Sequence, residues 1–331
     1  MPLPGQGGAR PDPPKRPNML TRKSFLLGAT ATLLLSATSG AVLAQAQFDL
    51  SPEPASRLHA EKVDAIASLL PADFDFAKDG TFTIAIAAGA PPTATYATDG
   101  ATIVGFDPDL GRLVGEVLGV PTEIIPIAWA DWPLGLTGGK YDAVISNVGV
   151  TEERKEKYDF STYRIGVHGF YVAKDSAITE IKEPKDIAGL RIITGSGTNQ
   201  ERIALQWDEQ NQAAGLAPIE LQYYDDEAAA LLAISSGRAD VQLNPNAPLA
   251  YQAAVTGQTK LVGLISSGWP NPADVGVTTR KDRGLAEPIT AAINSLIETG
   301  TYGELLDQWG VAEEAVDVSR TNPPGLPKPK P

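Results

Sequence analysis

Apolar and polar positions follow two patterns along most of the chain, one typical of β-strands and one typical of helices. The run at residues 81–88 is nearly continuous and β-branched, as in strands that are covered on both faces. After Asp107, which is placed to be an N-cap, apolar residues recur at helical spacing up to Leu118, so one face of this helix should be buried. Similar patterns predict strands at 122–127, 142–145, 169–173, 191–194, 219–223 and 239–243, and helices at 131–138, 197–209, 226–237, 247–255 and 286–300.

Strands that alternate with helices through short links predict a parallel α/β arrangement. The alternation starts again after Phe160, so the chain should contain two lobes of similar build. A partial apolar stripe between residues 58 and 70 predicts a packing helix ahead of the first lobe, and the tail TNPPGLPKPKP at 321–331 should be extended.

The first candidate site is the segment YDAVISNVGVTEERKEKYDF at residues 141–160. It predicts a short buried strand, a polar loop at 146–149 and a helix that begins at Thr151. Hydroxyl, amide and backbone N–H groups at such a turn, with Arg154 as a bidentate cation, suit a small carboxylate. The competing interpretation is an ordinary turn in which Arg154 pairs with a neighbouring acid on the surface.

A second candidate loop, GSGTNQ at residues 195–200, also follows a predicted strand and opens a helix. Its glycines let the backbone approach a ligand, and Thr198 can cap the helix while free N–H groups face an anion. The loop lacks G-K-[ST], which disfavours nucleotide binding. Two such loops, one in each lobe, would face each other across a cleft, where Trp129 could stack on a ligand or instead pack in the core.

The N-terminal segment has the pattern of a secretory signal peptide. Met19, an alternative start, is followed by Arg22 and Lys23, an apolar run at 25–42 and a small-residue cleavage pattern ending at Ala44. The basic part resembles a twin-arginine export signal in which lysine replaces the second arginine. A retained membrane anchor is the less favoured interpretation, because no charged stop-transfer stretch follows the run.

Charge and composition exclude several classes of function. The formal charge is −13, and removal of residues 1–44, with five basic residues and one acid, takes it to −17. Nucleic acid and anionic membrane surfaces are poor partners for such a chain. The absence of cysteine excludes disulfides and thiol nucleophiles, and His59 and His168 have no second ligand at zinc spacing, so we expect no metal and no cofactor. Ser196 lacks the spacing of a nucleophile elbow, and we expect no catalytic residue.

From about residue 64 to 316 the chain resembles the family 3 solute-binding proteins, the periplasmic receptors of polar amino acid ABC transporters. The segments that carry the resemblance occur in the family's order: GTFTIAI, APP, IVGFDPDLGRLVGEVLGV, GLTGGKYDAVISNVGVTEERKEKYDFSTY, IAGLRIITGSGTNQE, AISSGRADV and ETGTYGELLDQWGV. The resemblance implies an α/β fold of the type II clamshell class, in which two crossing strands join two lobes. The domains are then a leader (1–44), a helical segment (45–70), lobe 1 (71–168 plus 279–311), lobe 2 with the hinge return (169–278) and a proline-rich tail (312–331).

The resemblance also implies roles for individual residues. Arg154 matches the arginine that pairs with the ligand's α-carboxylate, and Trp129 matches the stacking aromatic. The remaining matches are Ser146, Asn147 and Gly149 in the first loop and Thr198 and Asn199 in the second.

Several positions depart from the family pattern. Ala87 stands where the family has an acid, Ala90 and Thr93 where it has aromatics, and Gly149 where it has Ser or Thr. Pro245 stands where the acid that takes the α-ammonium is expected. The side-chain oxygen of Asn244 or Asn246 could accept from an ammonium there, although more weakly than a carboxylate.

These observations together lead to the expectation of a monomeric, non-enzymatic periplasmic receptor. It would bind an amino acid or a related small carboxylate by lobe closure and present it to a membrane ABC permease. The alternative is a periplasmic dehydratase-like enzyme that acts on a cyclic carboxylic acid. Such an enzyme needs an acid in the cleft, and Ala87 and Pro245 stand where acids would be convenient.

Overall fold

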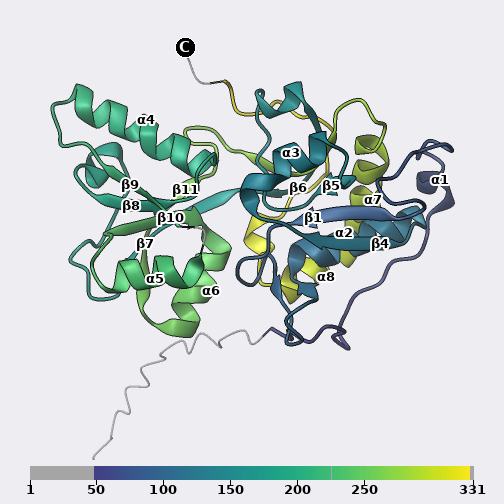
Figure 1. Ribbon diagram of the computed structural model, residues 1–331, viewed down its shortest axis with the longest axis horizontal. Helices are drawn as coiled ribbons and strands as arrows, with labels where there is room; N and C mark the ends of the chain where they lie inside the picture. The colour runs from purple at the N-terminus through teal and green to yellow at the C-terminus, as the bar shows by residue number, and fades with distance from the viewer. Residues whose placement is uncertain (1–47, 225, 329–331) are drawn as a thin grey trace, which may run out of the picture. The chain divides into compact units, whose positions relative to one another are not determined.

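The computed structural model describes residues 48–224 and 226–328, which form two five-stranded sheets with helices on both faces (Figure 1). The predicted signal peptide lies outside these residues. In the part of the chain that is described, no helix has the length and apolar character needed to cross a membrane.

The first sheet defines lobe 1 and has the order β4-β1-β5-β12-β6. β1 pairs in parallel with β4 and β5, whereas β12 runs antiparallel to both β5 and β6, so the sheet is mixed and not purely parallel as the local pattern suggested. Its strands are β1 (Phe82–Ile86), β4 (Thr122–Pro126), β5 (Ala143–Val144), β6 (Tyr158–Ile165) and β12 (Asp274–Arg280).

The second sheet defines lobe 2 and has the order β11-β7-β10-β8-β9. Here α4 covers one face, and α5 and α6 cover the other (Figure 1). The strands are β7 (Val167–Ala173), β8 (Arg191–Thr194), β9 (Glu220–Tyr223), β10 (Val241–Pro245) and β11 (Thr259–Ser266), and the helices are α4 (Asn199–Ala213), α5 (Glu227–Ser235) and α6 (Asn246–Thr256).

The chain passes between the sheets twice, from β6 to β7 and from β11 to β12. The two passages are hydrogen bonded to each other, because Gly166 N donates to Ala273 O and Ser267 N donates to Gly166 O, both at 2.9 Å. A side chain on Gly166 would clash with the hydroxyl of Ser267, which explains the glycine. Since β12 begins at Asp274, residues 274–278 lie with the first sheet, on the other side of the predicted boundary.

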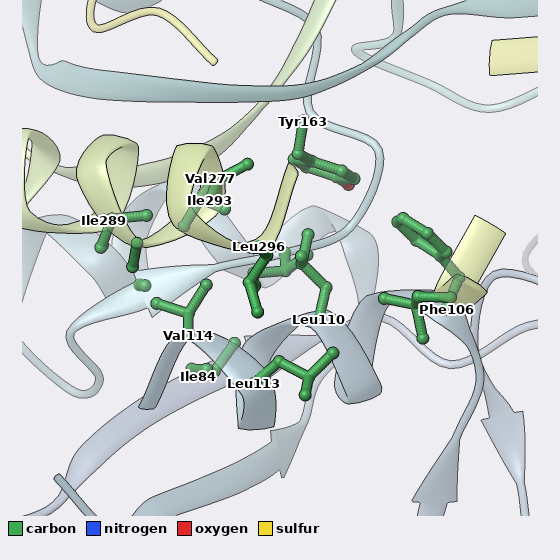
Figure 2. Packing of buried hydrophobic residues seen from close by; sticks show 14 of the residues in the cluster. Ile84, Phe106, Leu110, Leu113, Val114, Tyr163, Val277, Ile289, Ile293 and Leu296 are labelled. Carbon is green, nitrogen blue, oxygen red and sulfur yellow. The ribbon is translucent and has the colours of Figure 1, made fainter. Parts of the chain in front are cut away.

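The main core of lobe 1 lies between one face of the sheet and the helices α2, α7 and α8 (Figure 2). Alternate residues of β1 point to opposite faces, so Ile84 enters this core while Ala85 packs on the other face under α3. The helices of this lobe are α1 (Asp64–Ala67), α2 (Phe106–Leu118), α3 (Trp132–Thr137), α7 (Ala286–Glu298) and α8 (Thr301–Gln308). Short 3-10 turns are η1 (Trp129–Asp131), η2 (Arg154–Glu156), η3 (Pro184–Ile187) and η4 (Ala312–Glu314). A small hairpin consists of β2 (Thr95–Tyr96) and β3 (Ile103–Val104).

Helix α2 begins two residues earlier than predicted. Gly105, with φ 139°, is its N-cap, and no side chain caps the helix. The prediction that Asp107 is the N-cap was therefore wrong: its carboxylate is buried and accepts a hydrogen bond from the hydroxyl of Tyr163 at 3.2 Å. Tertiary contacts have replaced the local capping role.

The helix predicted to begin at Thr151 is also not present. Thr151 forms a parallel bridge with Leu326, and only the short 3-10 turn η2 follows it. Leu326 N donates to Val150 O at 3.0 Å, and Glu152 N donates to Leu326 O at 2.8 Å. A distant segment of the chain thus pairs with the backbone on both sides of Thr151, while the helical bonding is limited to one turn, with Lys155 N donating to Thr151 O at 3.0 Å.

This distant segment, residues 320–328, is the C-terminal strap. It runs along β6, where Asn322 N donates to Phe160 O at 2.9 Å, and continues to the bridge at Thr151. Gly325 permits the close approach, because a Cβ there would lie 2.8 Å from the carbonyl carbon of Thr151. The strap therefore forms an added edge to lobe 1, beside the first candidate site.

Candidate functional site

Residues 146–151, the lobe 1 loop, follow β5 and are held on several sides. The hydroxyl of Ser146 accepts a hydrogen bond from Ala87 N at 2.8 Å. Val150 N donates to Asp274 O at 2.9 Å, which fixes the loop to β12, while Leu326 of the strap pairs with its other edge. The loop is thus held by contacts with Ala87 directly after β1, with β12 and with the strap.

Asn147 links this loop to a buried ionic network. It has φ 54°, in the left-handed region, and its N–H donates to the hydroxyl of Tyr163 at 3.1 Å. Its side-chain oxygen accepts from Arg164 at 3.3 Å, so this side chain faces the lobe interior. Arg164 also pairs with Glu314 and lies 3.7 Å from Asp107. Burial raises the pKa of Asp107 to about 6, against the opposing effect of Arg164.

Arg154 projects from η2 toward lobe 2. Its Nη1 donates to Gly149 O at 2.9 Å, and its Nη2 donates to Gly197 O of the other lobe at 3.3 Å. Within the described residues no carboxylate lies within ion-pair distance of it, so the surface pair expected for an ordinary turn is not formed. Burial and the nearby charge of Arg202 lower the pKa of Arg154 to about 10, and it stays cationic at neutral pH.

Residues 195–199, the lobe 2 loop, meet Arg154 and the lobe 1 loop. Thr198 is the N-cap of α4: its hydroxyl accepts from Glu201 N at 3.2 Å and donates to Gly195 O at 2.6 Å. Asn199 is buried, and a Cβ on Gly149 would clash with its amide nitrogen. The glycine that departs from the family pattern therefore makes room for Asn199.

Asn244 and Asn246 lie where β10 passes into α6, and both have donors from their own lobe. The Asn244 oxygen accepts from the amide of Gln200 at 3.1 Å, and the Asn246 oxygen accepts from the hydroxyl of Tyr171 at 2.9 Å. A carbonyl oxygen has two lone pairs, so each could accept one further hydrogen bond. An ammonium at this end would meet shared, uncharged acceptors.

A cavity of about 650 Å³ lies between η1, α3 and η2 of lobe 1 and the lobe 2 loop with the start of α4, and Thr151 is the residue of the lobe 1 loop that lines it. Trp129, which is half-buried, lines it together with Arg154, Thr198 and Asn199. The guanidinium carbon of Arg154 lies 6.0 Å from the centre of the Trp129 ring, within cation–π range. The structure therefore brings Trp129, Gly149, Arg154, Thr198 and Asn199 together at the lobe interface.

Sequence reasoning missed two arginines near this site. Arg164 supports the lobe 1 loop from within the core, and Arg202, on α4, lines the cavity. The sequence around Arg202 does not indicate that it lines the cavity, apart from its position four residues after Thr198, which is one helical turn along. In the described residues no group of three or more His, Asp or Glu side chains is arranged to hold a metal.

Two α/β lobes joined by two passages, with facing loops around a cavity, define a two-lobe binding protein of the type II class. Comparison with known proteins agrees with this assignment. The model of the bacterial extracellular solute-binding proteins, family 3, matches residues 82–312, and the chain belongs to this family. The predicted fold class and family are thereby confirmed.

Characterised relatives of this chain bind amino acids. The L-cystine-binding protein TcyJ of Escherichia coli (strain K12) is 28% identical over 232 residues, which cover 70% of this chain and 82% of that protein. The L-arginine-binding protein of Pseudomonas aeruginosa is 27% identical over 245 residues, with 71% and 89% covered. A solved ancestral amino acid-binding protein, AncCDT-1, described as a precursor of cyclohexadienyl dehydratase, is 27% identical with a TM-score of 0.60 and covers 70% of this chain and 95% of its own.

Proposed function

We propose that the chain is the periplasmic substrate-binding receptor of an ABC importer and that it binds an amino acid or a related small carboxylate. Its similarity to cystine- and arginine-binding proteins supports an amino acid as the solute. The predicted signal peptide at residues 1–44 supports export. The delivery partner is a membrane permease, and the receptor acts as a monomer without a cofactor.

The observation that carries the proposal is the state of Arg154. It is a half-buried cation at the lobe interface, and within the described residues its guanidinium donates to two backbone carbonyl oxygens and to no carboxylate. A buried guanidinium without a carboxylate is unfavourable, and a ligand carboxylate would supply the missing partner through charge-assisted, bidentate hydrogen bonds. Ser146 and Gly149 of the lobe 1 loop and Thr198 of lobe 2 then surround the same group, and Trp129 stacks on the carbon skeleton of the ligand.

Binding would act by shifting the balance between open and closed lobes. A ligand that touches both loops binds the closed arrangement more tightly and so increases its population. Asn199, Asn244 and Asn246 contribute from lobe 2 after closure. The permease would then recognise the closed form.

A dehydratase-like activity on the same scaffold has less support. AncCDT-1, as a precursor of cyclohexadienyl dehydratase, relates this fold to such an enzyme, but a general acid is needed in the cleft. Ala87 and Pro245 occupy the two positions where the sequence would place one. Of the glutamates that line the cavity, Glu153 is exposed, Glu156 pairs with Lys328 and Glu201 already accepts two hydrogen bonds.

The test is a thermal-shift screen of the mature chain against the amino acids, followed by calorimetry of the best ligand. A ligand at 100 times its Kd should stabilise the fold by about 2.7 kcal/mol. Arg154→Ala should weaken binding by at least about 100-fold, because a charge-assisted pair is lost. Arg283→Ala, an exposed arginine elsewhere in lobe 1, is the control. Unchanged affinity in Arg154→Ala would remove Arg154 from its role.

A further inference from the structure

Two guanidinium groups from opposite lobes meet at the cavity. Arg154 comes from lobe 1 and Arg202 from α4 of lobe 2, and both line the space of about 650 Å³. The charge of Arg202 contributes to the lowered pKa of Arg154. Like charges at an interface oppose lobe contact unless a third group neutralises them.

Neither guanidinium is neutralised by a carboxylate of the described chain. Arg154 donates to the carbonyl oxygens of Gly149 and Gly197, and Arg202 donates to Pro327 O of the strap at 3.4 Å. The Nε atom of Arg202 is buried and has no hydrogen-bond partner among the residues that the structure describes. Carbonyl oxygens satisfy N–H groups but leave the positive charge uncompensated.

The acids that line the cavity do not form ion pairs with the two arginines. Glu156 is paired with Lys328, and Glu201 accepts from Gly197 N and from the hydroxyl of Tyr223, each at 2.6 Å. Glu153 acts on both guanidinium groups, but it is exposed to solvent. Lys157 adds another positive charge to the lining. The lining as a whole carries three acids and three cations, but no carboxylate of the described chain lies within ion-pair distance of Arg154 or Arg202.

We propose that the solute carries two acidic groups, one held by Arg154 and the lobe 1 loop and the other by Arg202. This inference rests on the proposed function and narrows it to small dicarboxylates, acidic amino acids among them. Arg202 is then a specificity-determining residue. A ligand that joins the two cations also removes the repulsion between the lobes and thus favours closure.

The same geometry disfavours neutral and basic side chains. An amide can offer only an uncharged oxygen to Arg202, and an ammonium or guanidinium would place a third cation beside two others. Pro245, where the family's acid would take the α-ammonium, lies outside the cavity lining, so the selection by charge rests on Arg154 and Arg202.

Isosteric pairs of ligands provide the experiment. Calorimetry on the mature chain compares L-glutamate with L-glutamine and L-aspartate with L-asparagine, and adds L-2-aminoadipate as a longer diacid. The acid of at least one pair should bind about tenfold or more tightly than its amide, because a charged hydrogen bond replaces a neutral one. Arg202→Met should remove this preference while the affinity for the amide changes less than about twofold.

Two further variants keep the test decisive. Arg202→Lys retains the positive charge and should keep most of the preference for the acid over the amide. It therefore distinguishes an effect of the charge from a disturbance of the structure. Arg238→Met removes an exposed arginine of the same lobe, away from the cavity, and should change nothing. Circular dichroism confirms that each variant is folded.

The outcomes distinguish this inference from the proposed function. Equal or tighter binding of the amides or of basic amino acids, still dependent on Arg154, would overturn the diacid inference and leave the receptor function standing. Full acid preference in Arg202→Met would overturn the role of Arg202. Failure of every amino acid to bind the folded chain would overturn both proposals.

Discussion

The two loops that meet at the cavity are held in different ways. The lobe 1 loop is fixed by β12, by the C-terminal strap and, through Asn147, by the buried network around Arg164. The lobe 2 loop is held by its own neighbours: Thr198 bonds to Gly195 and Glu201, and Gly197 to Glu201. Its residues 196 and 197 are exposed. The lobe 1 loop is thus tied to several distant parts of the chain, whereas the lobe 2 loop has mainly local partners. Under the proposed function, ligand binding would therefore order the lobe 2 loop more than the lobe 1 loop.

The largest effect should come from the network behind the lobe 1 loop. Arg164→Met leaves Glu314 and Asp107 buried without their cation, and breaking a buried pair in this way costs about 3–5 kcal/mol. Urea unfolding measures it. The matched control is Arg191→Met in lobe 2, which breaks a partly exposed pair with Asp240 and should cost about 1 kcal/mol or less. A similar loss of unfolding free energy in the two variants would contradict the claim that the lobe 1 loop rests on a stronger network than the lobe 2 loop.

Lobe 2 also differs from lobe 1 in containing a buried histidine, His168, at the start of β7. Both ring nitrogens lack partners among the described residues, and burial lowers the pKa of His168 to about 3. The unfolded chain takes up this proton below about pH 6.5, so protons favour unfolding between pH 6.5 and 3. The chain should therefore be fully stable with respect to this group above pH 6.5 and lose about 2 kcal/mol at pH 5.

His168→Phe tests this pH dependence, because it keeps an aromatic ring and removes the titrating group. Thermal melts between pH 4 and 8 should show a flatter acid side in the variant. Asp107 acts in the opposite direction, since its raised pKa lets the folded chain hold a proton more tightly as the pH falls through about 6. A wild-type acid slope that survives unchanged in His168→Phe would refute the assignment.

The strap should contribute less. Gly325→Ala puts a Cβ against the backbone of Thr151 and forces the strap or the loop to shift. Overpacking costs about 1–3 kcal/mol, and the lower end is expected here because the strap lies at the surface. Ligand affinity should fall with stability, since the lobe 1 loop loses an edge. Gly303→Ala, where a Cβ meets nothing within 4 Å, is the control, and equal behaviour of the two variants would exclude the strap from the site.

The smallest effect is expected in lobe 2. Thr198→Ala removes the N-cap of α4 and should cost about 1 kcal/mol of stability. Asp226→Ala removes the corresponding cap of α5, away from the cavity, and should cost about the same. Only Thr198→Ala should also weaken ligand binding in calorimetry. If both variants bind equally well, Thr198 is a cap and nothing more.

Local patterns predicted the elements better than the contacts between them. The strand at 81–88 and the helix up to Leu118 follow from periodicity, and both are present as β1 and α2. The pairing of Thr151 with Leu326 joins residues far apart in the sequence, so no local signal could reveal it. Local sequence also could not reveal the contacts of Asp107 with residues of strand β6, which replace its expected role as an N-cap.

The candidate site shows the same limit. Arg154, Thr198 and Asn199 lie at the facing loops and could be selected from turn chemistry and the family pattern. Arg202 could not, because a single arginine on an amphipathic helix is usually solvated, and only the approach of the lobes makes it part of the cavity. The inward direction of the Asn147 side chain likewise depends on Arg164, a residue of another strand.

Hydrogen exchange on the mature chain, with and without the best ligand, tests the central claim most directly. The claim is that a preformed lobe 1 loop captures the carboxylate and that closure then orders the lobe 2 loop. Exchange at residues 195–202 should slow by at least about tenfold on ligand binding, while residues 146–152 should be protected already and change little. A lobe 1 loop that exchanges freely until ligand is added, with no change in lobe 2, would contradict the account.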